Sequence, residues 1–239
     1  MILINNNKNS TETNPEFAYR VIKENILSLV LRPGDSISET ELSGILNISR
    51  TPIREALVHL KKENLINVYP QKGTFISLLD FNLIEEAVFM RTILEQEVIS
   101  LATSNFPDLF LIKLEKNLLF QKKITEFSTS AFNFFDLDNK FHEIIFTGCG
   151  KPNIWKQIQI ISSHFNRVRL LDAMNRKSLN STFEEHLNIY NAIKEKNSKL
   201  ANSIIKGHIL NFYKELEVLF NKYPHFFTSK VLKQKPPLK

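Results

Sequence analysis

The chain has 239 residues but only one cysteine, and it contains no long uninterrupted apolar run. Because Cys149 has no second cysteine to pair with, an internal disulfide framework is excluded. A membrane-spanning helix needs about 18 or more consecutive apolar residues, so we expect no membrane partner. The opening stretch MILINNNKNSTETNPEF lacks the basic and long apolar segments of a signal peptide. These absences favour a protein that works in the reducing cytoplasm.

Net positive charge is small outside the end of the chain. The formal net charge is +6, but residues 15–78 carry eight basic against seven acidic side chains, and residues 79–225 carry eighteen against seventeen. The last fourteen residues supply most of the excess, because they contain no acid and four lysines: Lys230, Lys233, Lys235 and Lys239. Overall charge is therefore weak evidence for DNA binding. A local excess between Arg50 and Lys72, with five basic and two acidic residues, is more informative.

The N-terminal third shows the order of elements of a winged helix-turn-helix. Residues 1–14 are polar and Asn-rich, which predicts a disordered arm. Ser38 and Glu41 have the spacing of a capping box at the start of a helix. Apolar periodicity and turn residues predict three helices and a hairpin: helices over 17–31, 39–46 and 49–64, and strands over 66–69 and 74–78. This succession within about sixty residues is typical of a winged helix-turn-helix domain over 15–78.

Beyond Asp80 the pattern becomes helical throughout. Six amphipathic segments separated by short breaks predict an antiparallel all-α bundle: 81–103, 108–128, 132–147, 152–175, 182–196 and 198–221. We expect a mostly α protein with a helical effector domain over 79–225 and a basic tail over 226–239. The linker over 78–82 is short, so we expect the two domains to be mechanically coupled.

One long stretch carries a family resemblance. LRPGDSISETELSGILNISRTPIREALVHLKKENLINVYPQKGTFI resembles the DNA-binding domain of the GntR family, through PGD-x-I-S-E-x-E-L, ISRTPIREAL and a GTFI wing. Asn47 and Asn64 stand where the family usually has glycine, and Asn is the next-best residue for a left-handed backbone. Thr40 replaces an Arg that contacts DNA in the fatty-acid-responsive member, so that role is not transferred.

The third predicted helix carries the candidate base-contacting residues. Arg50 and Arg54 are four residues apart and share one face at the start of this helix. A recognition helix presents its N-terminal residues to the major groove, where Arg pairs bidentately with guanine. The alternative is that both arginines are solvated surface charges. The surrounding pattern favours the DNA-binding interpretation.

Four further residues complete the predicted DNA interface. Ser49 and Thr51 lie at the helix start, where the helix dipole favours contact with a phosphate. Lys72 and Gly73 lie at the hairpin tip, and glycine allows the backbone of such a wing to approach the minor groove closely. One wing covers only a few base pairs, so we expect a homodimer bound to an inverted-repeat operator in double-stranded DNA.

The second predicted domain contains a possible metal site. Asp138 and His142 are four residues apart on one helical face, and His186 and His208 each lie on an apolar stripe of another helix. Buried polar side chains are costly unless something satisfies them. A divalent metal such as Zn, Ni, Mn or Fe would do so, since these ions accept imidazole ligands. The alternative for each histidine is a hydrogen-bonded core residue.

Residues 80–222 also resemble a known sensor domain. The pattern R-T-I-L-E-x-E around Arg91, then D-x-x-x-F-H, then E-H-x-x-I-x-x-A-I and a later His, is similar to the FCD domain of the FadR-type branch of the GntR family. The resemblance implies that Asp138, His142, His186 and His208 bind a metal that helps to hold a carboxylate effector. Arg91 could bind that carboxylate through its guanidinium fork, or instead pair with Glu95. Arg167 and Arg169 are further cationic candidates.

The predicted function is a ligand-responsive DNA-binding transcriptional regulator. Of repressor and activator, repressor is the favoured prediction. Three alternatives stay open: a purely structural metal, a metal-free pocket of the fatty-acid type, and, remotely, a metal-dependent enzyme. An open Asp/His site could support hydrolysis. However, no Glu, Ser or Cys lies at motif spacing to act as base or nucleophile, and an enzyme would not need the N-terminal wing. The sequence leaves the effector unidentified, whether sugar acid, lactate-like acid, dicarboxylate or fatty acid.

Overall fold

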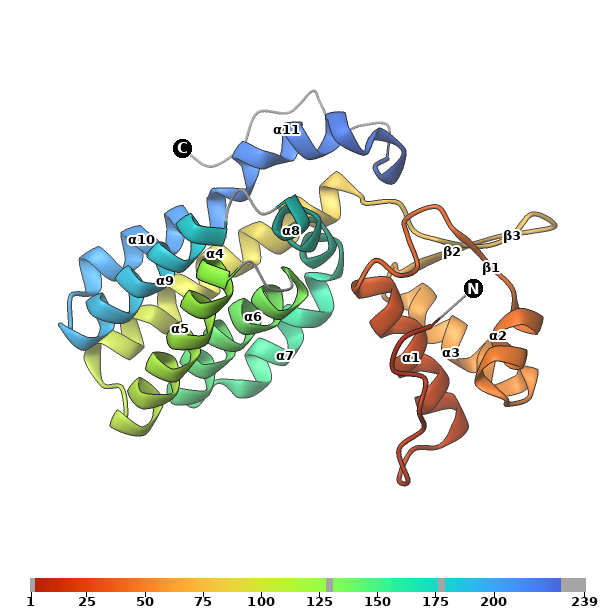
Figure 1. Ribbon diagram of the computed structural model, residues 1–239, viewed down its shortest axis with the longest axis horizontal. Helices are drawn as coiled ribbons and strands as arrows, with labels where there is room; N and C mark the ends of the chain where they lie inside the picture. The colour runs from red at the N-terminus through yellow and green to blue at the C-terminus, as the bar shows by residue number, and fades with distance from the viewer. Residues whose placement is uncertain (1–2, 128–130, 176–178, 229–239) are drawn as a thin grey trace. The chain divides into compact units, whose positions relative to one another are not determined.

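The computed structural model of the protein describes residues 3–127, 131–175 and 179–228 (Figure 1). The chain divides into two compact units, which we describe separately. Within the described residues, unit 1 comprises 3–81 and 220–228, and unit 2 lies within 82–219.

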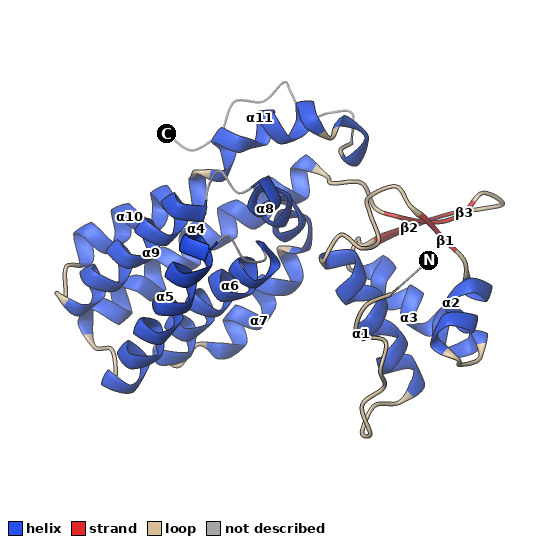
Figure 2. Cartoon of the chain, viewed as in Figure 1, coloured by secondary structure: helices blue, strands red, loops and turns tan. Residues whose placement is uncertain are grey.

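Unit 1 contains a three-helix core and a small sheet. Its elements are α1 (Asn14–Leu27), β1 (Ser36–Ile37), α2 (Glu39–Leu46), α3 (Arg50–Lys62), β2 (Ile66–Tyr69) and β3 (Gly73–Ile76). The strands pair antiparallel in the order β1-β3-β2, drawn in red in Figure 2. The winged helix-turn-helix prediction is confirmed. The sequence missed β1 because its two residues are too short for an alternating pattern.

The core of unit 1 forms where α1 packs against α3. Val21, Ile22 and Ile26 of α1 are fully buried, as are Ile53 and Leu60 of α3. They recur at the spacing of one helical face, so each helix turns its apolar stripe inward and leaves its polar face to solvent. This packing fixes the side of α3 that remains exposed.

Backbone conformation in unit 1 follows the local residue types. Asn47 and Asn64 adopt left-handed backbone with φ of 53° and 58°, as predicted for residues in the place of glycine. The predicted capping bond of Ser38 is absent, because that side chain makes no cap hydrogen bond. A capping box forms instead at the start of α1, between Thr13 and Glu16.

Residues 3–13 differ from the predicted disordered arm. Leu3 is buried, and the backbone of Ile4 exchanges two 2.9 Å hydrogen bonds with the buried Asn25 side chain. The Arg20 guanidinium donates to the backbone oxygens of Asn5 and Asn7. The polar composition concealed this packing, because side chains of α1 satisfy the backbone of the segment. Residues 1–2 lie outside the described part of the arm.

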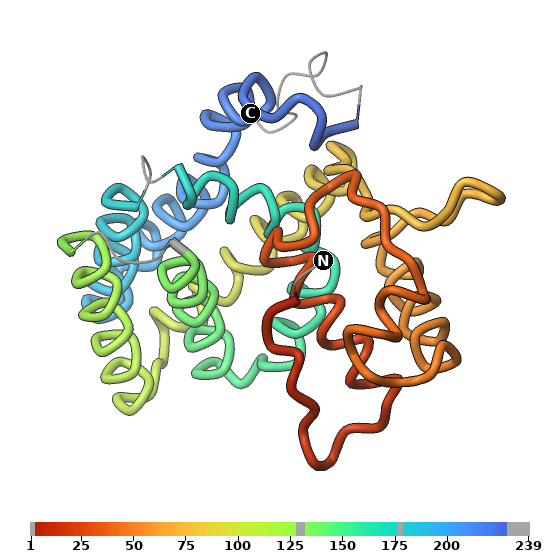
Figure 3. The backbone as a smooth tube through the Cα atoms, turned by 45° about the vertical axis from the view of Figure 1, so that its right-hand side comes forward, coloured from red at the N-terminus to blue at the C-terminus, as the bar shows by residue number. Residues whose placement is uncertain are grey.

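Unit 2 is an all-α bundle, as predicted. Its helices are α4 (Phe81–Ser104), α5 (Asp108–Phe127), α6 (Ala131–Gly148), α7 (Pro152–Ile161), α8 (Ser163–Asn175), α9 (Leu179–Lys194), α10 (Ser198–Leu210) and α11 (Phe212–Lys222). Within it α5 packs against α6 and α9, and α9 packs against α10, so these helices run back and forth beside one another (Figure 3). No described helix is both long enough and apolar enough to cross a membrane.

Two segments of unit 2 that the sequence predicted as single helices are interrupted. The segment over 152–175 breaks at Ser162, and the segment over 198–221 breaks at Asn211. Neither break contains Pro or Gly, the residues that usually mark the end of a helix. The apolar periodicity also continues through each break, so nothing in the sequence signals an interruption.

The end of the described chain belongs to unit 1. A short 3-10 helix, η1 (Pro224–Phe226), is followed by buried Phe227. Leu79 N donates to Phe226 O at 2.8 Å, and Thr228 N donates to Leu79 O at 3.0 Å. The structure therefore differs from the predicted boundary at residue 225, because two phenylalanines pair with the linker before the basic tail begins. The four lysines of that tail lie outside the described residues.

Candidate metal centre and nucleic-acid interface

The predicted base-contacting arginines project from the solvent face of α3. The Arg50 and Arg54 side chains are 55% and 61% exposed, whereas Ile53 and Leu60 of the same helix are fully buried. Both pair with one carboxylate oxygen of Glu39, at 3.1 Å from Arg50 Nη2 and 2.7 Å from Arg54 Nε. Burial raises the pKa of Glu39, but its hydrogen bonds to the two arginines lower the pKa below its ordinary value overall.

The other predicted DNA-binding residues are also accessible. Ser49 and Thr51 are exposed at the start of α3, and the Ser49 side chain makes no cap hydrogen bond there. Lys72 and Gly73 are exposed at the tip between β2 and β3. Gly73 has φ of 114°, which other residues rarely adopt, so glycine is required by the turn itself.

A polar clamp ties the far end of α3 to α1. Lys23 Nζ lies 2.6 Å from Glu63 Oε2 and donates to the Tyr19 hydroxyl at 2.7 Å, while Tyr19 donates to Glu63. Burial lowers the pKa of Lys23, but bonds to Glu63 and Tyr19 raise it overall. The clamp and the apolar core both fasten α3 to α1, so the orientation of the helix that carries the two arginines is set by packed elements.

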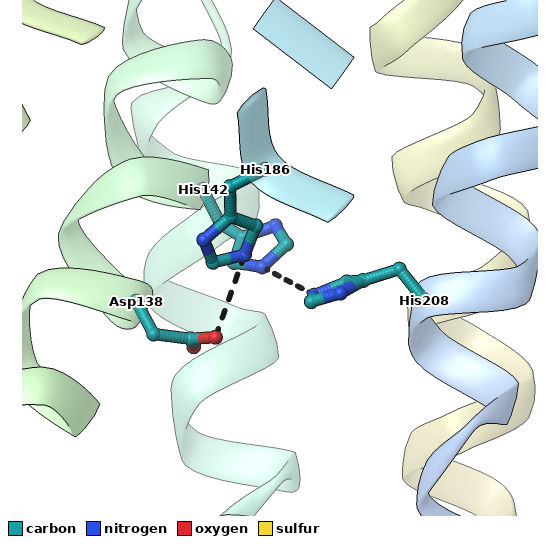
Figure 4. Close-up of side chains that lie close together, drawn as sticks. All are labelled: Asp138, His142, His186 and His208. Atoms are coloured by element: carbon teal, nitrogen blue, oxygen red, sulfur yellow. Dashed lines mark hydrogen bonds and ion pairs between the residues drawn. The ribbon is translucent and has the colours of Figure 1, made fainter. Parts of the chain in front are cut away.

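In unit 2 the four predicted metal ligands come together. Asp138 and His142 project from α6, His186 from α9 and His208 from α10, and their candidate ligand atoms all lie within 4.8 Å of one another (Figure 4). His142 Nε2 and His208 Nε2 are 3.2 Å apart, and His186 Nε2 lies 3.5 Å from Asp138 Oδ1. Asp138, His142 and His186 are buried, and His208 is partly buried. This cluster could hold a metal ion.

Each imidazole of the cluster is oriented by a second side chain. All three Nδ1 atoms lie 2.7–2.8 Å from an oxygen: His142 from Glu95, His186 from Gln121 and His208 from Glu185. Gln121 is itself fixed by donating to Asn117 Oδ1 at 2.6 Å. An oxygen partner places the proton on Nδ1, which leaves the Nε2 lone pair directed into the cluster. Histidines that bind metals are oriented in this way.

The charge state of the cluster suits a metal as well. Burial, reinforced by the neighbouring histidines and arginines, holds the pKa of His186 well below its ordinary value. Burial also lowers the pKa of His208, although its hydrogen bond to Glu185 opposes the shift. Neutral imidazole is the form that binds a metal. His186 Nε2 is buried with no hydrogen-bond partner among the described residues, an unfavourable state that a bound cation would relieve.

Arg91 makes the ion pair that the sequence left as one alternative. Its Nε lies 2.5 Å from Glu95 Oε1, and both side chains are 2% exposed. The other oxygen of Glu95 contacts His142, so one carboxylate joins Arg91 to the cluster. Burial would raise the pKa of Glu95, but the charge of Arg91 and the hydrogen bonds from Arg91 and His142 hold it well below the usual range. Arg91 Nη2 has no hydrogen-bond partner among the described residues, so the ion pair leaves a donor for a ligand.

A cavity of about 280 Å³ adjoins the cluster. Asp138, His208 and Arg91 line it, together with Arg169. Arg169 pairs with Asp138 and donates to Asn139 and Asn166 at 3.1 and 3.0 Å. Burial lowers the pKa of Arg169, and the charge of Arg91 lowers it further, as expected for two cations sharing one cavity. Arg167, the other cationic candidate, is not among the described residues that line the cavity.

Comparison with known proteins agrees with both halves of this description. Residues 15–76 match the model for bacterial regulatory proteins of the gntR family, and residues 86–211 match the FCD domain. The FCD match alone covers just over half of the chain. The chain belongs to the GntR family. It has the N-terminal helix-turn-helix and C-terminal FCD domain of the FadR-type branch, as the sequence predicted.

Similar proteins match most of the chain. An HTH-type transcriptional regulator from an unstable DNA locus of Streptomyces ambofaciens is 28% identical over 217 residues, 91% of each chain. The transcriptional repressor RspR of Escherichia coli K12 is 26% identical over 201 residues, 84% of this chain and 88% of RspR. The structure of E. coli McbR/YncC superposes with a TM-score of 0.73 at 20% identity, covering 89% of this chain and all of that one, which supports the shared fold.

The two family matches establish the broad function of this chain. It is a DNA-binding transcriptional regulator with an FCD domain, and its relatives are regulators rather than enzymes, as predicted. The sequence did not reveal the residues that contact the predicted site residues: Glu39 at the DNA face, and Gln121 and Glu185 at the cluster. Their contacts join positions 11 to 65 residues apart, so no local spacing could have revealed them.

Proposed function

We propose that this GntR-family regulator is a repressor whose operator affinity changes when a small carboxylate binds at a metal held by Asp138, His142, His186 and His208. One observation carries the proposal. Three imidazole Nε2 atoms and one carboxylate converge beside a cavity that also contains two guanidinium groups. A structural metal alone would not account for a cavity with two cationic side chains.

The donor set fits a divalent transition metal. Three neutral imidazoles and one carboxylate suit Zn, Ni, Mn or Fe. The Nδ1 contacts to Glu95, Gln121 and Glu185 would fix the ring planes and make the nitrogens better ligands. When bound, the metal would supply positive charge and a Lewis-acidic contact for a carboxylate.

Two arginines would orient the effector carboxylate. Arg91 Nη2 is unpaired among the described residues, although its Nε is held by Glu95. Arg169 pairs with Asp138, and a metal bound to Asp138 would draw that charge away from the guanidinium. The planar fork of Arg suits a carboxylate. We therefore assign Arg91 to effector binding and add Arg169.

On the DNA side, we assign base contacts to Arg50 and Arg54. Their exposure on one face of α3 supports this role. Ser49, Thr51, Lys72 and Gly73 would bind the backbone and the minor groove. A homodimer on an inverted-repeat operator supplies the second recognition helix. We place DNA binding within residues 15–78, effector binding within residues 79–225, and the protein in the cytoplasm with the chromosomal DNA.

The test combines metal analysis with DNA binding. A duplex selected from a random library by the purified chain serves as operator, and elemental mass spectrometry measures bound metal. We expect about one divalent metal per chain, and loss of metal and of any effector response in His186→Ala/His208→Ala. Coupling of effector to operator affinity should be about 1–3 kcal/mol. The control His225→Ala removes an exposed histidine of unit 1, and this variant should retain the bound metal and the effector response.

Each outcome bears on a different part of the proposal. A metal-free wild type under metal-replete conditions, with effector response intact in the double variant, would leave these histidines as core residues. Retained metal with no carboxylate response would indicate a structural metal. Absence of any sequence preference in the selected DNA would contradict the assignment of α3 as the recognition helix.

A further inference from the structure

The cavity beside the cluster is chemically uneven. Among its described lining residues, the buried polar ones are Arg91 and Asp138. The remaining buried lining is apolar and includes Phe134, Phe165, Val168, Leu179, Ile209 and Leu219. The other polar lining residues lie at exposed or half-exposed positions, and they include the neutral Ser181, Thr182 and Asn211 and the charged Asp172, Lys214 and Glu215. The buried end of the cavity therefore offers two charged groups and apolar surface, whereas the other hydrogen-bonding groups lie at its more accessible positions.

Aromatic rings also hold the two arginines in place. The Phe165 ring lies 5.5 Å from the Arg91 guanidinium and 5.6 Å from that of Arg169. The ring of Phe135, a further lining residue, lies 5.1 Å from the Arg169 guanidinium. These contacts favour the cations and restrict their motion. A carboxylate bound by both arginines would leave the rest of its molecule against phenylalanine rings.

The charged groups in direct contact with the cluster favour a ligand with a single negative charge. Arg91 and Arg169 are opposed by three carboxylates, Glu95, Asp138 and Glu185, which contact them or the histidines. With neutral imidazoles the group carries one negative charge, and a divalent metal would convert this to one positive charge. Unbalanced charge is unfavourable in a buried site. One carboxylate would neutralise it, whereas a dicarboxylate would leave an excess negative charge.

We propose that the effector is a monocarboxylate with an apolar, ring-sized body, rather than a sugar acid or a dicarboxylate. This inference rests on the proposed function, because it places the carboxylate at the metal and the two arginines. The hydroxyl groups of a sugar acid would be buried against Phe134 and Phe165 without partners, which is costly. A phenyl or branched alkyl body would instead bury apolar surface there.

The experiment measures dissociation constants by calorimetry for the full chain loaded with one equivalent of Zn²⁺. The probes are phenylacetate and 4-methylpentanoate, gluconate as a hydroxylated monoanion, succinate as a dianion, and 2-phenylethanol as a neutral analogue. We expect phenylacetate to bind about tenfold or more tightly than gluconate, since burying a ring adds apolar area. Succinate and 2-phenylethanol should both bind more weakly than phenylacetate.

A matched pair of variants locates the binding. Phe135→Leu shortens a half-buried lining residue, whereas Phe132→Leu makes the same change on the same helix at an exposed position that is not among the described lining residues. We expect Phe135→Leu to weaken phenylacetate binding about threefold or more and to retain Zn²⁺, because no ligand is altered. Phe132→Leu should bind phenylacetate as the wild type does.

The outcomes separate this inference from the proposed function. Tighter binding of gluconate or succinate than of phenylacetate would overturn the inference and leave the proposed carboxylate site intact. Binding of 2-phenylethanol as tightly as phenylacetate would show that the carboxylate is not recognised, and would overturn both. Zn²⁺ binding without a response to any of these acids would also overturn both.

Discussion

Arg–Glu ion pairs occur at both candidate sites, in opposite surroundings. At the DNA face, Glu39 is 29% exposed and pairs with two arginines that are more than half exposed. In unit 2, Arg91 and Glu95 are each 2% exposed. An exposed pair contributes little to stability, whereas breaking a buried pair leaves an uncompensated charge. The same chemistry therefore keeps charges available to a partner in unit 1 and fixes a rigid site in unit 2.

The largest effect is expected from breaking the buried pair. Glu95→Gln removes the charge opposite Arg91 and the acceptor of His142 Nδ1. We expect a loss of about 3–5 kcal/mol in the free energy of unfolding, together with weakened metal binding. The single tryptophan, Trp155, is buried in α7 with its ring 5.8 Å from that of His142, so its fluorescence reports urea unfolding of this unit.

The matched control for that substitution is Glu97→Gln. Glu97 is an exposed residue of the same helix, and its substitution should change the free energy of unfolding by less than about 0.5 kcal/mol. Equal effects of the two variants would mean that the buried pair is not essential to unit 2.

The next largest effect concerns the exposed arginines. Arg50→Ala and Arg54→Ala should each cost about 1–3 kcal/mol in operator binding, because each removes a bidentate base contact. Stability should hardly change, since both side chains are largely exposed. Competition binding against a scrambled duplex measures the loss of specificity. Wild-type discrimination by Arg54→Ala would show that α3 does not contact the bases as proposed.

The wing offers a contrasting variant for the same measurement. Lys72→Ala should weaken binding to operator and scrambled duplexes alike, and lower the salt slope by about one ion, as expected for a phosphate contact. A change in sequence preference instead would assign Lys72 to base contacts.

The two regions also differ in how far the sequence could predict them. The winged helix-turn-helix followed from local signals, including Asn47 and Asn64 at the left-handed turns. The four cluster residues were predictable because helical spacing and the FCD resemblance place them on inward faces. Such signals cannot show which distant residue meets which, so Gln121, which orients His186 from 65 residues away, was missed.

Features that leave no mark in the neighbouring sequence could not be predicted either. Helix interruptions at Ser162 and Asn211 contain no Pro or Gly, and the packed segment over 3–13 depends on the side chain of Asn25. In the segment over 3–13 the structure is decided by tertiary contacts, which override the propensity of the local sequence.

A smaller effect is expected from pH on unit 2. The pKa of His186 in the folded protein is well below its ordinary value, because burial favours the neutral ring. The unfolded chain then binds the proton more readily, so stability is fully present above about pH 6.5 and is lost as pH falls below it. Each such histidine contributes at most about 1.4 kcal/mol per pH unit. We expect metal-free protein to unfold at lower urea concentration at pH 5.5 than at pH 7.5.

The comparison that isolates this effect is His186→Gln, which cannot titrate in that range. Its urea midpoint, followed by Trp155 fluorescence, should depend less steeply on pH than that of the wild type. An unchanged slope would assign the pH dependence to other groups.

The smallest effect on stability, and the sharpest contrast with Glu95→Gln, is expected for Glu39→Gln. Because its pair with Arg50 and Arg54 is exposed, the free energy of unfolding should change by less than about 1 kcal/mol. Its effect should appear in DNA binding instead. Glu39 occupies one of the five N–H donors of each arginine and cancels one of their two charges, so it restrains both side chains while leaving donors free for bases.

Without that carboxylate, the arginines should bind any phosphate more readily. We expect Glu39→Gln to bind a scrambled duplex about three- to tenfold more tightly, with a steeper salt dependence, and to discriminate less well between operator and scrambled DNA. The control Glu55→Gln removes one exposed charge from α3 itself, at a residue that makes no ion pair with either arginine within the described structure. It should strengthen binding to both duplexes alike. If Glu39→Gln behaved in the same way, Glu39 would act through its charge alone and would not position the arginines.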